Sequence, residues 1–211
     1  MFPVMKRGGA GFTLVELMVT LAVFGFLLSI AVPNMSRWVV KNKAGAVAEF
    51  YADGFSTARR MAVSRNAETR LSLLQQPSNV NGQFDWQIDI CYPTPVLACD
   101  ANGLWSTTTA PAGNDPKGVA GDVSILRPSD ALPSSGMLTP SMLPANASVI
   151  YFTPLGWVDT NIANRLTRIQ FDPSPAYVGD IPASAVVVTL SGMASTCNPT
   201  VTASDSRACP P

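Results

Sequence analysis

The chain has 211 residues, no histidine, and fourteen basic residues balanced by fourteen acidic ones. Because histidine is the commonest general base and a frequent metal ligand, its absence argues against an enzyme and against a bound metal or other cofactor. Beyond an apolar N-terminal segment, the length suffices for one modest domain.

The N-terminal segment joins a short basic leader to a long uncharged stretch. Lys6 and Arg7 precede four small residues at 8–11, and no charge occurs between Leu17 and Ser36. That stretch has about the length that a helix needs to cross a bilayer. An ordinary secretory signal has its small-residue cleavage site after the apolar region, whereas here the site comes before it. Cleavage there would leave the apolar segment on the mature protein.

Glu16 interrupts the beginning of this apolar segment. A carboxylate near a membrane helix costs on the order of 2.5–3.5 kcal/mol on insertion scales, so Glu16 is a functional candidate whose partner would be a cation. The alternative is a carboxylate favoured by the dipole of the first helical turn and extended toward the headgroups. Lys6 and Arg7 orient the leader side toward the cytoplasm, and the remainder of the chain is then extracytoplasmic.

The sequence Gly-Phe-Thr-Leu-Val-Glu at 11–16 resembles the type IV prepilin signature. The resemblance implies cleavage by prepilin peptidase after Gly11 and N-methylation of the new N-terminus, Phe12. It also implies that Glu16 is the assembly carboxylate, which pairs with the N-terminal ammonium of a neighbouring subunit. The protein is then expected in the inner membrane as a single-pass protein with its head in the periplasm, and later in a pilus at the cell surface.

Pro33 either ends the membrane span or kinks a longer helix, because its ring nitrogen removes a backbone hydrogen bond. The helical pattern resumes after it, which favours the kink. Apolar or small residues recur at a spacing of three to four at Val47, Phe50, Tyr51, Ala58, Met61 and Ala62. We expect the helix to end near Arg65–Asn66, where asparagine suits a C-cap. A helix from Phe12 to that point would be about 80 Å long, so its first half must be covered by a bilayer or by other subunits.

The pattern changes to a period of two beyond the helix, and this change predicts strands. Phe84, Trp86, Ile88 and Ile90 form the clearest run, with Asp85 and Asp89 assigned to the wet face of the sheet. Shorter strand candidates are Thr69–Leu74, Val123–Leu126, Val149–Thr153, Thr167–Phe171 and Ala185–Leu190. Turn-rich stretches at 106–121 and 128–147 either contact partners or are tolerated surface.

These elements predict an α+β protein of the pilin-like fold. A long N-terminal helix, transmembrane in its first half, packs with its second half against an antiparallel β-sheet head. The expected segments are a leader peptide at 1–11, a transmembrane and assembly helix at 12–33, an amphipathic helix at 34–66 and an extracytoplasmic β-rich head at 67–211.

All four cysteines, Cys91, Cys99, Cys197 and Cys209, lie in the predicted head. An even count in an oxidising compartment favours disulfides, and the sequence alone allows three connectivities. Loop closure favours the local pairs, Cys91 with Cys99 and Cys197 with Cys209. Their spacing is too wide for a four-cysteine zinc site. Loop aspartates such as Asp115 and Asp122 make only a weak case for calcium.

The head resembles that of the FimT/GspH-like minor pilins, also called pseudopilins. The resemblance rests on the helix end at 62–66, the strand around Trp86, and the stretches at 152–156 and 186–192. It implies a minor pilin of a type IV pilus that helps to initiate assembly. Its partners would be other minor pilins, the major pilin, prepilin peptidase and the inner-membrane assembly platform. The alternative is a pseudopilin of a type II secretion system, which would share every one of these residues.

A third function, DNA binding, is disfavoured by the residues after the last predicted strand. Some FimT-like pilins bind DNA through a Gly-Arg-x-Arg motif there, and the matching stretch is Gly192-Met193-Ala194-Ser195. Both arginines, whose forked donors would bind phosphate, are missing. The chain from residue 76 onward also carries a net charge of −5, against +4 for residues 34–75. The basic stretch is either a solvated helix face or a contact for anionic lipid or acidic neighbours.

Overall fold

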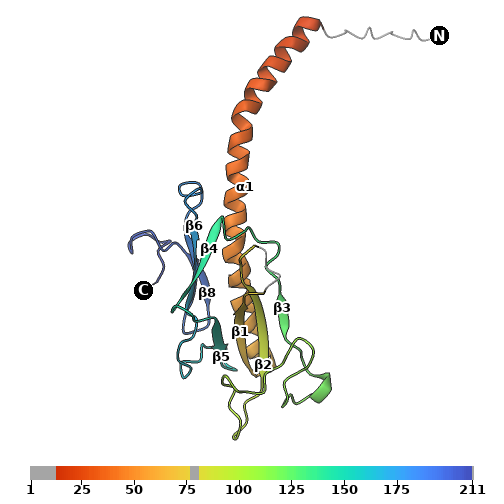
Figure 1. Cartoon of the computed structure of the whole chain (residues 1–211), viewed down its shortest axis with the longest axis vertical. Helices are drawn as coiled ribbons and strands as arrows, with labels where there is room; N and C mark the ends of the chain where they lie inside the picture. Colours follow the sequence, from red (N-terminus) through yellow and green to blue (C-terminus); the bar gives the residue numbers. More distant parts are fainter. Residues whose placement is uncertain (1–12, 77–80, 211) are drawn as a thin grey trace, which may run out of the picture. The chain divides into compact units, whose positions relative to one another are not determined.

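A computed structural model describes residues 13–76 and 81–210, and the chain divides into two compact units between Val40 and Lys41. One helix, α1 (Leu14–Arg65), begins in the first unit and ends in the second. The described part of the first unit, up to residue 40, is helical from Leu14 onward. The second unit contains the rest of α1 and all the strands (Figure 1).

The C-terminus of α1 is closed by a left-handed asparagine. Asn66 has a φ of 48°, and its N–H donates to the Val63 carbonyl oxygen at 3.3 Å. The N–H of Ala67 donates to the Ala62 carbonyl oxygen at 3.1 Å. These two bonds form a Schellman motif, which satisfies carbonyls that the helix end would leave without partners. The helix therefore ends where the sequence predicts, and the chain enters the first strand directly.

Within the described residues, eight strands form two antiparallel sheets of four strands each. Figure 1 shows these strands in the part of the chain that contains the second half of α1. The first sheet has the order β3-β2-β1-β5, with β1 (Glu68–Leu74), β2 (Asp85–Cys91), β3 (Ile125–Arg127) and β5 (Val149–Phe152). The second has the order β4-β6-β7-β8, with β4 (Leu138–Leu143), β6 (Arg168–Pro173), β7 (Ser184–Val188) and β8 (Ala194–Cys197). A short 3-10 helix, η1 (Gly118–Ala120), lies in the long connection before β3. The α+β arrangement is confirmed, but the strands form two sheets where one was predicted.

The second half of α1 packs against both sheets. The ring of Tyr51 stacks on Phe171 of β6, with ring centroids 5.2 Å apart. On the side of the first sheet, the indole N–H of Trp86 donates to the Phe50 carbonyl oxygen at 3.1 Å. A Cβ placed on Gly54 would lie 3.1 Å from the Trp86 ring, so the missing side chain allows helix and sheet to approach closely. The helix is thus the shared core element of the head.

The hydroxyl of Tyr51 forms hydrogen bonds with the backbone of Phe84, just before β2, in place of a neighbouring strand. It donates to the carbonyl oxygen of Phe84 at 2.9 Å, and the Phe84 N–H lies 3.0 Å from the same oxygen. Burial raises the pKa of the Tyr51 phenol above its ordinary value. The neutral hydroxyl can therefore both donate and accept, and it fixes the entry of β2 onto the helix.

Two strands were missed because their local sequence does not resemble a strand. β4 contains Pro140 and lies inside a stretch that was expected to be turn-rich. Proline is tolerated there because β4 is an edge strand, so one side of its backbone needs no ladder partner. β8 has only four residues, two of them hydroxyl-bearing, and lies at the opposite edge of the same sheet. Both strands form because they pair with a neighbouring strand, and not because their residues have a strong intrinsic preference for β structure.

The assignment of Asp85 and Asp89 to a wet face is wrong. Their side chains are almost fully buried, because the chain after β2 returns over that face of the sheet. Asp85 accepts hydrogen bonds from the N–H and the hydroxyl of Ser129 at 2.8 and 2.9 Å. Asp89 is paired with Arg70 of β1 at 2.7 Å. The alternation correctly predicted a strand, but it could not show that a distant loop covers the polar face.

A small second core holds this loop on the sheet. It consists of buried Cys91, Cys99, Trp105 and Tyr151. The guanidinium carbon of Arg70 lies 4.6 Å from the centre of the Trp105 ring, within the range of a cation–π contact. Cys91 and Cys99 are joined by a disulfide, as are Cys197 and Cys209. Both disulfides join the pairs that loop closure favours.

Replacing Cys91 and Cys99 together by serine is expected to lower the free energy of unfolding by about 2–4 kcal/mol, through the lost cross-link and the buried hydroxyls. The matched control replaces Cys197 and Cys209, which are partly exposed, and should cost less. Denaturant unfolding of the purified full-length protein in detergent measures both. Equal losses in the two double variants would show that the second core adds nothing to the cross-link.

Candidate functional site

The described chain begins with an N-cap. The N–H of Glu16 donates to Thr13 Oγ1 at 3.2 Å, and the N–H of Leu17 donates to the Thr13 carbonyl oxygen at 3.1 Å. Threonine followed three residues later by glutamate has the spacing of a capping box. Glu16 therefore lies in the first turn of α1, where the helix dipole favours a negative charge.

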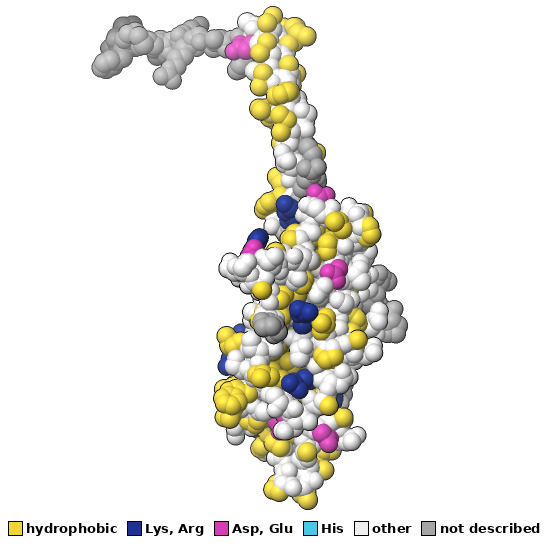
Figure 2. All heavy atoms as spheres, turned by 90° about the vertical axis from the view of Figure 1, so that its left-hand side faces the viewer, with side chains coloured by type: hydrophobic (Ala, Val, Ile, Leu, Met, Phe, Trp, Pro, Cys, Tyr) yellow, Lys and Arg dark blue, Asp and Glu magenta, His cyan; other side chains and the backbone are white. Residues whose placement is uncertain are grey.

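An apolar surface without protein contacts follows this turn. Leu14–Val32 is the candidate membrane span among the described residues, with 19 residues, none of which is buried. Even its large side chains are 45–74% exposed. Figure 2 shows hydrophobic side chains covering the visible face of this part of α1. Exposed apolar surface on that scale marks a membrane or protein contact. Glu16 is thus a carboxylate at the start of an apolar segment that is more stable in a membrane or a protein contact than in water.

The structure describes some of the predicted N-terminal site residues and not others. Gly11 and Phe12 lie outside the described residues, so their predicted roles in cleavage and methylation stay predictions. Pro33 lies inside α1, which continues past it. One turn of the helix there is supported by the Asn34 side chain, whose Nδ2 donates to the Ile30 carbonyl oxygen at 3.1 Å. A kink at Pro33 also stays a prediction.

Residues 6–32 match the family model described as the prokaryotic N-terminal methylation motif. The matched segment contains the small-residue junction, Glu16 and the apolar span. It supports a type IV pilin-like substrate of prepilin peptidase, and the apolar helix fits a membrane anchor of a single pass. No curated protein and no solved structure shows significant similarity to the chain. The match ends before the head, so the head must be interpreted from its own geometry.

The stretch that corresponds to the DNA-binding motif, 192–195, covers the end of the turn after β7 and the first two residues of β8. Gly192 has a φ of 77°, and a Cβ there would collide with the carbonyl oxygen of Gly156. The glycine is therefore required by the turn itself. Met193 and Ser195 are exposed, but neither carries a charge. Positions 193 and 195 are therefore exposed as phosphate-binding arginines would be, but they carry no arginine.

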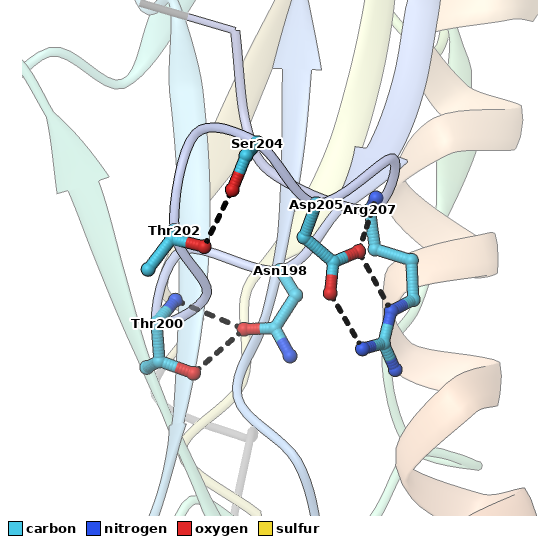
Figure 3. Close-up of polar contacts among 6 residues, drawn as sticks. All are labelled: Asn198, Thr200, Thr202, Ser204, Asp205 and Arg207. Atoms are coloured by element: carbon cyan, nitrogen blue, oxygen red, sulfur yellow. Dashed lines mark hydrogen bonds and ion pairs between the residues drawn. The ribbon is translucent and has the colours of Figure 1, made fainter.

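The C-terminal loop closed by Cys197 and Cys209 contains the last cation of the chain (Figure 3). Arg207 Nε and Nη2 bind the two carboxylate oxygens of Asp205 at 3.1 and 2.8 Å. Hydrogen bonds from Arg207 lower the pKa of Asp205 to about 2. On the other side of the loop, Asn198 Oδ1 accepts hydrogen bonds from the N–H and hydroxyl of Thr200. Arg207 is therefore engaged within its own loop, which further disfavours phosphate binding.

The loop aspartates considered for calcium are engaged within the protein, Asp122 with two cations and Asp115 with two backbone N–H groups. Asp122 Oδ1 lies 2.8 Å from Arg65, and its Oδ2 lies 3.7 Å from Lys117. Asp115 accepts the N–H groups of Lys117 and Asp122. Within residues 13–76 and 81–210, no three side chains of His, Cys, Asp or Glu lie together as metal ligands would. Asp122 therefore ties the loop to the end of α1, and Asp115 stabilises the loop itself.

Sequence reasoning missed an apolar surface around two turns of the head. Arg59 of α1 donates from Nε to the carbonyl oxygens of Gly156 and Ser191, at 3.2 and 3.3 Å. It thereby joins the turn after β5 to the turn after β7. Large apolar side chains more than half exposed on these segments and on the neighbouring helix are Val63, Leu155, Trp157, Leu190 and Met193. Exposure depends on which segments meet in space, so the sequence offered no signal for this surface.

Glu68, at the start of β1, is expected to weaken the fold at neutral pH. Partial burial and the nearby charge of Asp159 raise the pKa of Glu68 above its ordinary value. The folded state therefore holds this proton more tightly, and stability falls as pH rises from the ordinary glutamate pKa through the raised one. Glu68→Gln should raise the unfolding midpoint at pH 7 and leave it unchanged below the ordinary pKa.

The control for this prediction is Asp159→Asn, which removes the smaller of the two causes and should give a smaller gain of the same sign. Thermal unfolding of the three proteins across pH 4 to 7 measures the effect. A loss of stability in Glu68→Gln at pH 7 would mean that the carboxylate is favourably solvated or paired.

Proposed function

We propose that this protein is a minor pilin that is incorporated in a type IV pilus and helps to initiate pilus assembly. The observation that carries the proposal is the position of Glu16, in the capped first turn of an apolar helical segment, Leu14–Val32, that has no buried residue. Within the described chain, the only favourable interaction of this carboxylate is with the dipole of the helix N-terminus. Its position suits a cation supplied by another subunit.

Cleavage after Gly11 would create that cation. The N-methylated ammonium of Phe12 in one subunit would pair with Glu16 of its neighbour, and each charge would offset the desolvation of the other. The exposed apolar surfaces of Leu14–Val32 would then pack against one another when the subunits leave the bilayer. A kink at Pro33 would let the anchoring part of α1 adjust its direction between membrane and filament.

Two features of the head support the proposal that the protein is a minor subunit of the FimT/GspH-like group. The helix end at Arg65 leads through a Schellman turn into β1, and Trp86 of β2 seats on the helix. They lie in two of the four stretches on which the sequence resemblance rests, the others being 152–156 and 186–192. The proposed partners are other minor pilins, the major pilin and the inner-membrane assembly platform, with the head in the periplasm until assembly. The proposed role is structural and involves no catalysis.

A type II secretion pseudopilin is the alternative, because Glu16 and the apolar span would serve it equally. The two functions differ in the phenotype of a deletion. We expect a deletion strain to lose most surface pili, and sheared pili of the parent strain to contain the processed chain. Loss of protein secretion with normal pili would assign the chain to type II secretion instead. DNA shifts by the purified protein are not expected, and a shift at physiological salt would favour the DNA-binding function.

A further inference from the structure

Trp38 lies beyond the candidate span with its side chain in the open. Its side chain is 60% exposed, and that of Met35, one turn earlier, is 62% exposed. Neither side chain is among the buried residues of the described chain. A large amphipathic ring in this place needs a partner, and tryptophan is enriched where a helix leaves the hydrocarbon for the headgroups.

The spacing between Glu16 and Trp38 matches a bilayer. The two residues are 22 positions apart on one helix, which gives about 33 Å at the α-helical rise. The hydrocarbon core of a bilayer is about 30 Å thick. Residues 17–36 between them carry no charge. If Glu16 lies at the inner headgroup layer, Trp38 reaches the outer one.

The side chains leading to Trp38 form one stripe. Phe24, Leu28, Met35 and Trp38 follow one another at helical intervals of three, four or seven residues, which places them on the same face. In the sequence, Lys41 follows three residues later. The order of aliphatic side chains, tryptophan and then lysine is that of a helix passing from lipid tails through headgroups into water.

We propose that Trp38 is an interfacial anchor that binds the phospholipid headgroup layer of the outer leaflet and sets the depth of the helix. With Trp38 seated there, Glu16 is held at the opposite interface, where the carboxylate stays hydrated until it meets its cation. The inference deepens the proposed function, because it concerns the membrane form that precedes assembly. It requires the helix to span a bilayer, but it does not require a filament.

Depth-dependent fluorescence quenching tests this anchor. The full-length protein is reconstituted in vesicles of phosphatidylethanolamine and phosphatidylglycerol, whose acyl chains carry bromine either near the headgroup or near the chain end. We expect shallow bromine to quench the tryptophan fluorescence more strongly than deep bromine. Trp38→Phe should abolish most of the quenching. Trp157→Phe is the matched control, because Trp157 is equally exposed at 60% but belongs to the head, and it should leave the quenching unchanged.

Three results would overturn the anchor. They are quenching that persists in Trp38→Phe, quenching that is stronger with deep bromine, and a wild-type protein that is not quenched at all because another protein surface covers Trp38. The measurement is independent of pili. A strain with normal pili after deletion of the gene, combined with shallow quenching at Trp38, would reject the proposed function and retain the anchor.

Discussion

Glu16→Gln is expected to remove the protein from filaments while leaving its processing and membrane insertion intact. Glutamine keeps the size and the polar contacts of the side chain but carries no charge, so it inserts at least as readily. What it loses is attraction to a desolvated cation in the neighbouring subunit. We expect the amount of this protein in sheared pili to fall by about tenfold or more, since charge pairs gain strength away from water. Immunoblots of sheared pili and of membranes measure the two pools.

The matched control is Glu49→Gln, which neutralises an exposed carboxylate on the same helix, in the part that belongs to the head. It should leave the amount in pili unchanged. If Glu16→Gln were incorporated as well as the parent protein, Glu16 would serve only to favour the first turn of α1. The hypothesis of an intersubunit ion pair would then be wrong.

Trp86→Ala is expected to have the largest effect on the stability of the head. The indole is 2% exposed, lies against Phe50 at a centroid distance of 5.9 Å, and donates its N–H to the Phe50 carbonyl oxygen. Its removal leaves a cavity between α1 and β2 and removes the indole donor from the Phe50 carbonyl oxygen. We expect a loss of about 3–5 kcal/mol in the free energy of unfolding. Denaturant titration of the purified full-length protein, followed by circular dichroism, measures it.

Trp157→Ala makes the same chemical change at an exposed position and should alter the free energy of unfolding by about 0.5 kcal/mol or less. The comparison separates the packing of the helix on the sheet from a general effect of removing an indole. Similar losses in the two variants would show that Trp157 is also structural. The apolar surface around Arg59 would then be part of the core.

The elements with strong local signals were predictable. The helix end near Asn66 follows from a residue that tolerates a left-handed backbone, and α1 ends at Arg65. The strand over residues 84–90 follows from strict alternation, and β2 covers Asp85–Cys91. In both cases the decisive interaction is local, because a backbone conformation or a two-sided strand can be recognised within a few residues.

What could not be predicted depends on residues far apart in the sequence. Asp89 was placed in water because it alternates with apolar residues, yet Arg70 and the loop that contains Trp105 bury it. β4 was missed because Pro140 is unfavourable in most strands and is tolerated only at an edge. The division into two sheets likewise reflects pairing partners, which alternation within one strand does not specify.

The candidate site divides in the same way. Glu16 could be identified from six consecutive residues, because a carboxylate at that position of an apolar segment is unusual and the stretch 11–16 resembles the prepilin signature. The role of Thr13 as its N-cap was not predicted. The surface around Arg59 could not be identified, since it forms only when two hairpin turns meet the helix. The signals for the apolar span and for the predicted processing site are therefore local, whereas the surface around Arg59 depends on the fold.

The most direct test of a pilin-like function is the N-terminal sequence and intact mass of the protein, expressed with and without its prepilin peptidase. We expect a mature chain that begins at methylated Phe12 only when the peptidase is present, and the full-length chain when it is absent. The full-length chain in both cases would mean that Gly11 is not a processing site. No ammonium at Phe12 would then be available to Glu16, and the protein would be a membrane-anchored domain without a route into a filament.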